Sequence, residues 1–273
     1  MYELIDTGNE EKLERFGDVI FARPDPQALW PKNKPELWKT ADATYTRDQK
    51  EGKWIYKNKI PESWNIEHGG ISFIIKPTAF KHTGLFPEHA SNWEWLRKVA
   101  PQGGEVLNLF GYTGGATLAC AQAGAKVVHV DGSKSAVTWA RENAELSKLA
   151  DKPIRWIVED VRVFVEREIK RGRKYDGIIM DPPSFGHGAN KELWKIEEDF
   201  LPLIENCKKL LSDNPSFFLI NGYAAGYSPI AYENNLLDLV EKYGGKIEKG
   251  ELTIQEKDGG RLLPCGIFAR WKK

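Results

Sequence analysis

The stretch Glu105-Val-Leu-Asn-Leu-Phe-Gly-Tyr-Thr-Gly-Gly115 is an apolar run that ends in a glycine-rich turn. Two later apolar runs also end in polar residues. Val127-Val-His-Val-Asp131 ends in an acid, and Ile178-Ile-Met-Asp-Pro-Pro-Ser-Phe185 ends in an Asp-Pro-Pro turn. In an open parallel sheet, ligands bind outside the carboxyl ends of the strands, where the strand order reverses. We therefore expect three strands whose ends line one ligand pocket.

Strand-like and helix-like segments alternate from Glu105 onward, which predicts βαβ units and a parallel sheet. The expected strands cover 105–110, 126–130, 154–158, 175–180 and 216–221. The expected helices cover 88–99, 116–123, 134–149, 161–170, 197–211 and 230–243. The tail, 246–254 and 262–271, predicts an antiparallel hairpin, which dinucleotide-binding domains lack. The expected fold class is therefore α/β: a Rossmann-like, doubly wound, mostly parallel seven-stranded sheet with a C-terminal antiparallel hairpin.

The N-terminal part differs in kind from the rest. Short apolar pieces are separated there by Pro24, Pro26, Pro31, Pro35 and Pro61, which rule out long helices. We expect a small β-rich domain over residues 1–75 and the α/β domain over 76–273. Four tryptophans in the first part favour a packed aromatic core over a surface that stacks bases.

Composition narrows the class of protein. The chain has 273 residues with 39 Lys+Arg and 39 Asp+Glu, so its net charge does not attract phosphate or membranes. A nucleic-acid partner stays open, because a local basic patch such as 167–174 can act alone. The 3 cysteines have no metal-ligand spacing, which predicts a reducing compartment and no bound metal. Without a membrane-spanning run or a signal pattern, the expected location is the cytoplasm.

Glycines dominate the turn after the first expected strand of the sheet. Main-chain N–H groups near the following helix start could hold the amino-acid tail of a ligand. The spacing of Gly111, Gly114 and Gly115 is not G-x-G-x-x-G, so the turn does not match a dinucleotide pyrophosphate site. The alternative is that the turn needs glycine only for its geometry.

Two acids follow the next strands. Asp131 suits two hydrogen bonds from a ribose diol, although it or Ser133 could instead cap the helix after it. Asp160, or the backbone beside it, could bind an adenine amino group, and capping of the helix that starts at Val161 is an equal alternative. Together with the glycine turn, these acids predict a nucleoside cofactor.

The segment Asp181-Pro-Pro-Ser-Phe185 is the expected chemical centre. Consecutive prolines lack N–H donors, so carbonyl oxygens and the Asp181 carboxylate would accept hydrogen bonds from an NH group about to be methylated. Phe185 would stack on a planar ring, as when a base is flipped out of its strand. Beside a nucleoside pocket, this pattern favours methyl transfer from S-adenosylmethionine, in which positioning supplies most of the acceleration and no metal is needed. The expected catalytic residues are Asp181, Pro182, Pro183, Ser184 and Phe185.

These residues resemble those of class I S-adenosylmethionine-dependent methyltransferases, and most of all the bacterial group related to large-subunit rRNA methyltransferases. The matching segments are 83–93, 108–114, 130–133, 181–185 and 263–266. The resemblance implies S-adenosylmethionine as cofactor, RNA such as rRNA as substrate, and a loop over 81–86 that closes on the cofactor. The cofactor-binding residues that we expect are Thr83, Gly84, Asn108, Phe110, Tyr112, Thr113, Gly114, Asp131, Gly132, Ser133, Asp160, Val161 and Asp181.

The cysteines decide between two kinds of methyl transfer. Methylation of cytosine C5 needs a cysteine that first attacks the ring. In relatives of that type the cysteine follows the fifth strand or lies within the Asp-Pro-Pro segment, where this chain has 221–226 and Ser184. We therefore expect methylation of a nitrogen or oxygen by direct displacement. A small-molecule or protein substrate, or a non-catalytic cofactor- or RNA-binding module, are the alternatives; a nicotinamide dehydrogenase is disfavoured by the glycine spacing.

Overall fold

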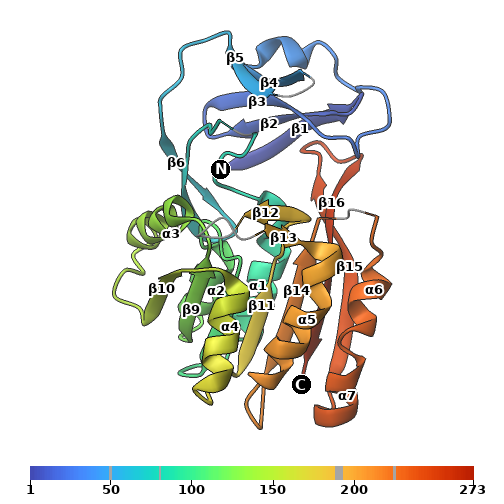
Figure 1. Ribbon diagram of the computed structural model, residues 1–273. Helices are drawn as coiled ribbons and strands as arrows, with labels where there is room; N and C mark the ends of the chain where they lie inside the picture. Colours follow the sequence, from blue (N-terminus) through green and yellow to red (C-terminus); the bar gives the residue numbers. More distant parts are fainter. Residues whose placement is uncertain (49–50, 80, 188–192, 224–225) are drawn as a thin grey trace. The chain divides into compact units, whose positions relative to one another are not determined.

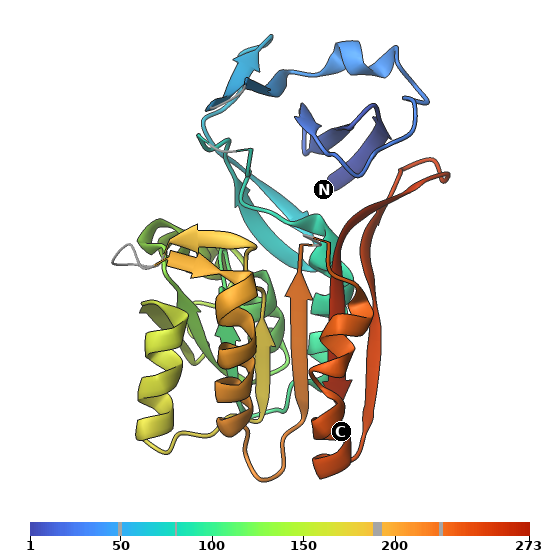
Figure 2. The ribbon, with the colours of Figure 1, turned by 45° about the vertical axis from the view of Figure 1, so that its right-hand side comes forward.

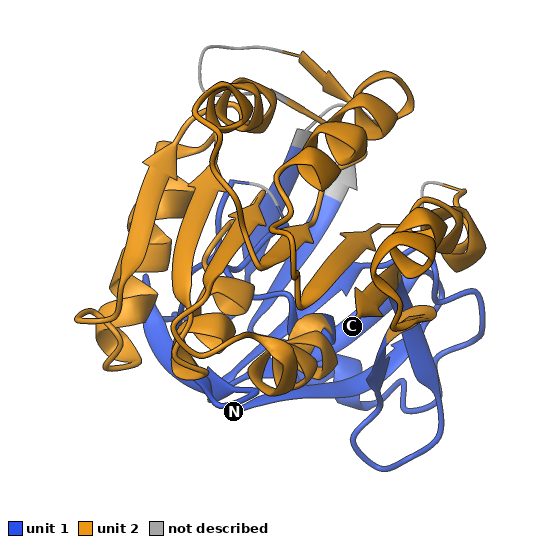
Figure 3. Ribbon diagram, turned by 90° about the horizontal axis from the view of Figure 1, so that it is seen from below, with its two compact units in different colours: residues 1–88, 253–265 blue, residues 89–252, 266–273 orange. Residues whose placement is uncertain are grey.

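The computed structural model describes residues 1–48, 51–79, 81–187, 193–223 and 226–273. The chain divides into two compact units, drawn in different colours in Figure 3. Unit 1 comprises Met1–Glu88 and Thr253–Cys265, and unit 2 comprises His89–Leu252 and Gly266–Lys273. The domain boundary after residue 75 that the sequence suggests stays a prediction.

Unit 1 is β-rich, as expected. Its larger sheet has the order β1-β2-β3-β4-β5, in which β3 and β4 pair in parallel and the other neighbours are antiparallel. β6 and β7 form a separate antiparallel pair. The strands are β1 Tyr2–Gly8, β2 Glu11–Phe16, β3 Val19–Pro24, β4 Ala43–Asp48, β5 Glu51–Tyr56, β6 Trp64–His68 and β7 Ile71–Ile75, with a 3-10 turn at Leu37–Thr40; a second 3-10 turn, Pro87–His89, spans the boundary between the units.

The tryptophans of unit 1 serve its packing. Trp54 and Trp64 lie against Phe21, with ring centroids 4.7 and 5.9 Å away. Each indole N–H donates inside the unit: Trp54 to the Thr78 carbonyl and Trp64 to the Phe16 carbonyl, both at 2.8 Å. An indole that is held by packing and by its N–H has little freedom to rearrange around a base.

A buried ion pair lies within this small sheet. The Arg23 guanidinium donates twice to the Glu14 carboxylate, at 2.7 and 2.9 Å, and the Tyr2 hydroxyl donates to it at 2.8 Å. Burial alone would raise the pKa of Glu14, but the charges of Arg23 and Lys12 and these hydrogen bonds hold it below its usual value. Removing one partner of such a pair leaves an uncompensated buried charge.

The main sheet of the chain has seven strands in the order β10-β9-β8-β11-β14-β16-β15, which confirms the expected fold class. β10, β9, β8, β11 and β14 are parallel, and β16 runs antiparallel to β14. The chain moves outward from β8 in one direction through β9 and in the other through β11, so the order reverses between β8 and β11. The strands are β8 Glu105–Leu109, β9 Lys126–Asp131, β10 Ile154–Val158, β11 Gly177–Met180, β14 Phe217–Gly222, β15 Lys246–Gln255 and β16 Leu262–Lys272.

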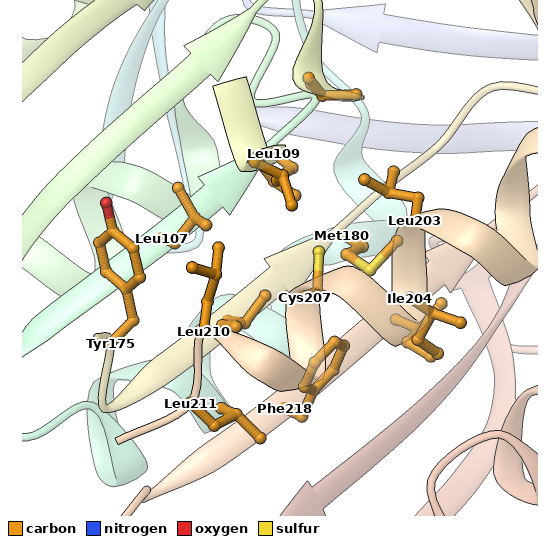
Figure 4. Close-up of a cluster of buried hydrophobic side chains, with 14 of the residues drawn as sticks. Leu107, Leu109, Tyr175, Met180, Leu203, Ile204, Cys207, Leu210, Leu211 and Phe218 are labelled. Carbon is orange, nitrogen blue, oxygen red and sulfur yellow. The ribbon is translucent and has the colours of Figure 1, made fainter. Parts of the chain in front are cut away.

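Helices cover both faces of this sheet (Figures 1 and 2). On one face α4 and α5 pack over the apolar side of β8, β11 and β14, where Met180 and Leu109 meet Leu203, Ile204 and Cys207 (Figure 4). On the other face, Trp95 of α1 packs edge-on against Phe217. The helices are α1 Ala90–Val99, α2 Gly115–Gln122, α3 Lys134–Leu146, α4 Val161–Lys170, α5 Ile196–Lys209, α6 Pro229–Asn234 and α7 Leu237–Tyr243.

Two features differ from the sequence expectation. The segment expected as one helix over 230–243 is two helices, because Asn235 ends α6 and its side-chain amide donates to the Ala231 carbonyl at 2.7 Å. A short hairpin, β12 Phe185–His187 with β13 Leu193–Lys195, follows β11 and was not expected. Within the residues that the structure describes, no helix is long and apolar enough to cross a membrane.

Candidate functional site

Five chain segments end at the carboxyl edge of the parallel strands. They are the turn after β8, Asp131 at the end of β9, Asp160 after β10, Asp181 after β11 and Tyr223 after β14. β8 and β11, between which the strand order reverses, are hydrogen-bonded neighbours, with Leu109 opposite Met180. The edge beside this pair is where open α/β sheets bind their ligands.

The turn after β8 has an unusual backbone. Phe110 and Tyr112 have φ angles of 58° and 47°, and Gly114 has 92°. Side-chain-bearing residues adopt this left-handed region rarely, at a cost of about 1–3 kcal/mol each, and they cluster at ligand sites. The turn is held by hydrogen bonds from Gly114 N to Gly111 O (2.9 Å) and from Tyr112 N to Asp131 Oδ2 (2.9 Å).

Two glycines in this turn serve packing rather than ligand approach. A Cβ at Gly111 would lie 2.4 Å from Cε1 of His129, and one at Gly115 would lie 2.5 Å from Cζ2 of Trp93. The neighbouring side chains therefore require glycine at both positions. Gly114 differs, since it needs glycine for its positive φ and begins α2.

Asp131 links the glycine turn to the start of α3, and its contact with a ribose stays a prediction. Its two oxygens accept N–H groups of Tyr112 and Ser133 at 2.9 and 2.8 Å. Burial raises the pKa of Asp131 and outweighs these two hydrogen bonds, which act to lower it. Ser133, not Asp131, caps α3, because its hydroxyl accepts the N–H of Ala136 at 3.3 Å. A carboxylate has about four lone-pair sites, so Asp131 can still accept two hydroxyl groups.

Asp160 caps α4 and binds Arg162. Its carboxylate accepts the backbone N–H of Arg162 at 2.9 Å and its guanidinium at 2.8 and 3.1 Å. Burial would raise the pKa of Asp160, but these contacts outweigh it and lower that pKa. Arg162 also donates to the Leu193 carbonyl and to Asp199. The capping alternative is thus realised, and contact of Asp160 or Val161 with adenine stays a prediction.

Asn108 and Thr113 form hydrogen bonds inside the protein. The Asn108 amide donates to the hydroxyl of Thr117 at 2.8 Å, and that hydroxyl lies 2.9 Å from Nδ1 of His129. Burial lowers the pKa of His129 to about 3, so this imidazole is neutral. The Thr113 carbonyl accepts the amide of Asn143 at 2.9 Å. These bonds fix the glycine turn, and direct cofactor contact by Asn108 or Thr113 stays a prediction.

The Asp-Pro-Pro turn is partly engaged within the protein. The Pro183 carbonyl accepts the indole N–H of Trp194 at 2.6 Å, and the Ser184 carbonyl accepts the N–H of Ile196 at 3.2 Å. These two carbonyls therefore hold the β12–β13 hairpin, whereas the sequence suggested acceptors turned outward. The Trp194 ring also packs edge-on against Phe110, with centroids 5.0 Å apart. Phe185 itself is 59% exposed.

Asp181 lies against His89, which is not among the catalytic or cofactor-binding residues expected from the sequence. Its Oδ2 is 3.4 Å from Nε2 of His89, which precedes α1. The imidazole is buried and faces the ring of Tyr223, while 25% of the Asp181 side chain is exposed. No spacing in the sequence links residue 89 to residue 181. Only the placement of α1 beside the carboxyl ends of β11 and β14 brings them together.

Thr83 and Gly84 belong to unit 1. Thr83 is buried, and Gly84 has a φ of 94°. Their assignment to cofactor binding stays a prediction, as do those of Gly132 and the loop over 81–86.

The donor and acceptor set of unit 2 fits a nucleoside that carries an amino-acid tail. Main-chain N–H groups at the start of α2 follow this turn, whose own Gly111, Tyr112 and Gly114 N–H groups are bound within the protein, and Asp131 offers acceptors at the end of the neighbouring strand. No cluster of three or more metal-ligating side chains occurs in the described part of the chain.

Comparison with known proteins identifies the family. Residues 41–226 match the family model described as S-adenosylmethionine-dependent methyltransferase. The chain is 39% identical to the S-adenosylmethionine-dependent methyltransferase of Agrobacterium tumefaciens, whose crystal structure superimposes with a TM-score of 0.92 over 99% of this chain and 90% of that one.

Curated relatives carry the same domain within longer chains. Ribosomal RNA large subunit methyltransferase K/L of Alteromonas mediterranea is 30% identical over 79% of this chain and 30% of its own length. The protein of the same name from Pseudoalteromonas atlantica is 33% identical over 77% of this chain and 28% of its own length. The chain thus spans less than a third of these relatives. With the fold and the family model, these matches show that the chain belongs to the S-adenosylmethionine-dependent methyltransferases, enzymes that use S-adenosylmethionine as methyl donor.

Proposed function

We propose that the chain methylates a nitrogen, or an oxygen, of a nucleobase in RNA such as rRNA, by direct displacement. One observation carries the proposal: Phe185, a large aromatic residue, is 59% exposed four residues after Asp181, at the edge where the strand order reverses. Phenylalanine is usually buried, and an exposed ring beside a hydrogen-bond acceptor suits the face and the edge of a planar base.

The chemistry assigns separate tasks to the residues. When bound, S-adenosylmethionine would supply a methyl group on a sulfonium, which can be transferred directly to a lone pair. Asp181 would accept the N–H of the base, orient the nitrogen lone pair toward the methyl group and take up the proton that this nitrogen loses. Phe185 holds the ring plane, and Trp194 fixes the turn through the Pro183 carbonyl. Positioning of this kind can supply about 7–11 kcal/mol of a barrier.

The cysteines support direct displacement. Cys120 and Cys207 are fully buried in α2 and α5, and burial raises the pKa of both thiols. Cys265 belongs to unit 1, and burial likewise raises the pKa of its thiol. A cysteine acts as a nucleophile when it is a thiolate with access to the substrate. None of the three has that character, which disfavours a covalent intermediate on the base.

The names of the relatives support an RNA substrate, since the K/L proteins are described as rRNA methyltransferases. An RNA substrate of this kind would also place the protein in the cytoplasm. A small molecule or a protein side chain is the second candidate, and the equal numbers of acidic and basic residues favour it.

The test is methyl transfer from S-adenosylmethionine labelled in its methyl group to an extract of cells that lack the gene, fractionated into RNA, protein and small molecules. Label in RNA, lost with Asp181→Ala while cofactor binding persists, is the expected result. Label confined to protein or small molecules would move the substrate to that class. Retention of full RNA labelling by the Asp181 variant would remove Asp181 from the chemistry.

A further inference from the structure

The hydroxyl of Tyr232 is buried without a hydrogen-bond partner among the described residues. Tyr232 lies on α6, is only 2% exposed, and stacks on Phe200 of α5 with ring centroids 5.3 Å apart at 19°. A buried hydroxyl with no partner lowers the stability of the fold, so such groups are uncommon in native proteins. For packing alone, phenylalanine would serve better at this position.

The hydroxyl lies at the carboxyl end of β14. A Cβ built on Gly222 would be 2.1 Å from the hydroxyl oxygen, so this oxygen packs directly on the Gly222 backbone. β14 pairs with β11, and Ile220 lies opposite Met180. Gly222 and Asp181 therefore follow neighbouring positions on adjacent strands, and the Tyr232 hydroxyl and the Asp181 carboxylate share one edge of the sheet.

Electrostatics give the same placement. Burial raises the pKa of Tyr232 to about 12, and the negative charge of Asp181 contributes to the shift. The phenol is accordingly protonated at any physiological pH and can act as a donor. After burial, the charge of Asp181 is the largest contribution to this shift, ahead of that of Tyr227.

We infer that Tyr232 is a positioning residue for Asp181: its hydroxyl donates to the Asp181 carboxylate when the methyl-accepting base is in place. This inference rests on the proposed function. In the structure, Asp181 is partly exposed and lies 3.4 Å from His89. A bound base would exclude water from the carboxylate, which then needs protein donors in its place.

The two hydrogen bonds are compatible on one carboxylate. A carboxylate has about four lone-pair sites, which accommodate the Tyr232 hydroxyl and the N–H of the base together. The Tyr232 hydroxyl on one side and the His89 ring, 3.4 Å away, would fix the plane of the group, and so the direction in which it accepts the substrate N–H. Tyr232 thus acts on the acceptor nitrogen through Asp181, without touching the base.

Tyr232→Phe removes only the oxygen and separates this role from packing. Loss of a hydrogen bond to a charged group predicts a fall in kcat of about tenfold to hundredfold. The KM for RNA and the affinity for S-adenosylhomocysteine should stay within about twofold, since neither is contacted. The melting temperature should be equal or higher, because an unpaired buried hydroxyl is gone. Tyr243→Phe, the same change on α7, is the matched control and should leave kcat unchanged.

A double-mutant cycle with Asp181→Asn shows whether Tyr232 acts through Asp181. The assay is methyl transfer to rRNA from cells that lack the gene. In the Asp181→Asn background, Tyr232→Phe should cost less than about twofold in rate, because the group that it positions is already altered. A full additive loss in the double variant, or wild-type kcat in the single variant, would overturn the inference.

The two proposals fail in different ways. If the wild-type enzyme labels no RNA, the proposed substrate is wrong, and the inference that depends on it falls as well. If the wild type labels RNA and Tyr232→Phe labels it equally fast, the substrate stands and the role of Tyr232 is refuted.

Discussion

Asp131→Asn is the sharpest single change at the cofactor site. The substitution keeps the size of the side chain, but an amide has one acceptor oxygen where the carboxylate uses two, toward Tyr112 N and Ser133 N. The amide NH2 must then face one of these N–H donors or turn away from it. The variant therefore lacks the carboxylate that would accept hydrogen bonds from the ribose hydroxyls. It also weakens the turn that would hold the amino-acid tail.

The size of the effect follows from the bonds involved. A hydrogen bond to a charged group contributes about 1.5–3 kcal/mol. At about 1.4 kcal/mol for each tenfold change, the affinity for S-adenosylhomocysteine should fall by roughly 10–150-fold. Isothermal titration calorimetry measures this directly.

Asp176→Asn is the matched control for this change. The Asp176 carboxylate also accepts two protein donors, Glu105 N at 2.9 Å and the Ser212 hydroxyl at 2.8 Å, but it lies at the amino ends of the strands. Its loss should lower stability and leave cofactor affinity unchanged. If Asp131→Asn folds normally and binds within twofold of the wild type, Asp131 does not hold the ribose.

The pKa of Asp131 adds a pH dependence to this prediction. Burial raises that pKa above the ordinary 3.8. A raised folded-state pKa means that the contribution of Asp131 to stability is full below its unfolded pKa and is lost as pH rises through the folded value. Ribose hydroxyls favour the ionised form, so cofactor affinity should decline as pH falls through the raised pKa. Asp131→Asn should abolish that dependence.

Three further changes test the fold around the site. Glu14→Gln leaves Arg23 buried without its counter-charge, so the free energy of unfolding in urea should fall by about 3–5 kcal/mol. An unchanged free energy of unfolding would show that the pair is not formed. Gly111→Ala places a Cβ against His129 and should cost about 1–3 kcal/mol, and an unchanged melting temperature would argue against that packing. Trp194→Phe removes the donor to the turn carbonyl, so kcat should fall about tenfold at constant cofactor affinity; unaltered kcat would separate the hairpin from catalysis.

The large sheet could be predicted because its strands carry local signals. The runs that became β8, β11 and β14 are mostly apolar and almost entirely buried, as is typical of strands covered on both faces, and β8 and β11 each end in a distinctive turn. The hairpin β12–β13 has no such signal. It depends on Trp194, which donates a hydrogen bond to the Pro183 carbonyl and packs against the Phe110 ring, and both groups lie outside the hairpin.

The residues of the candidate site could be chosen from the sequence, but most of the contacts between them could not. Asp131 and Asp181 could be chosen because they end apolar runs. The Ser133 cap of α3 is a local contact that the sequence had offered as an alternative, whereas the link from Asp160 through Arg162 to the hairpin and the contact of His89 with Asp181 are consequences of tertiary packing. Sequence spacing is a poor guide to such contacts, since each joins elements that approach only in the folded sheet.

Nucleoside analysis of ribosomal RNA tests whether this methyltransferase modifies a base in RNA. Ribosomal RNA from cells lacking the gene, complemented with the wild type or with Asp181→Ala, would be digested to nucleosides and compared by mass spectrometry. We expect one N- or O-methylated nucleoside that is absent from the deletion strain, restored by the wild type and not restored by the variant. An identical nucleoside profile in all strains, or restoration of a C5-methylated pyrimidine, would contradict it.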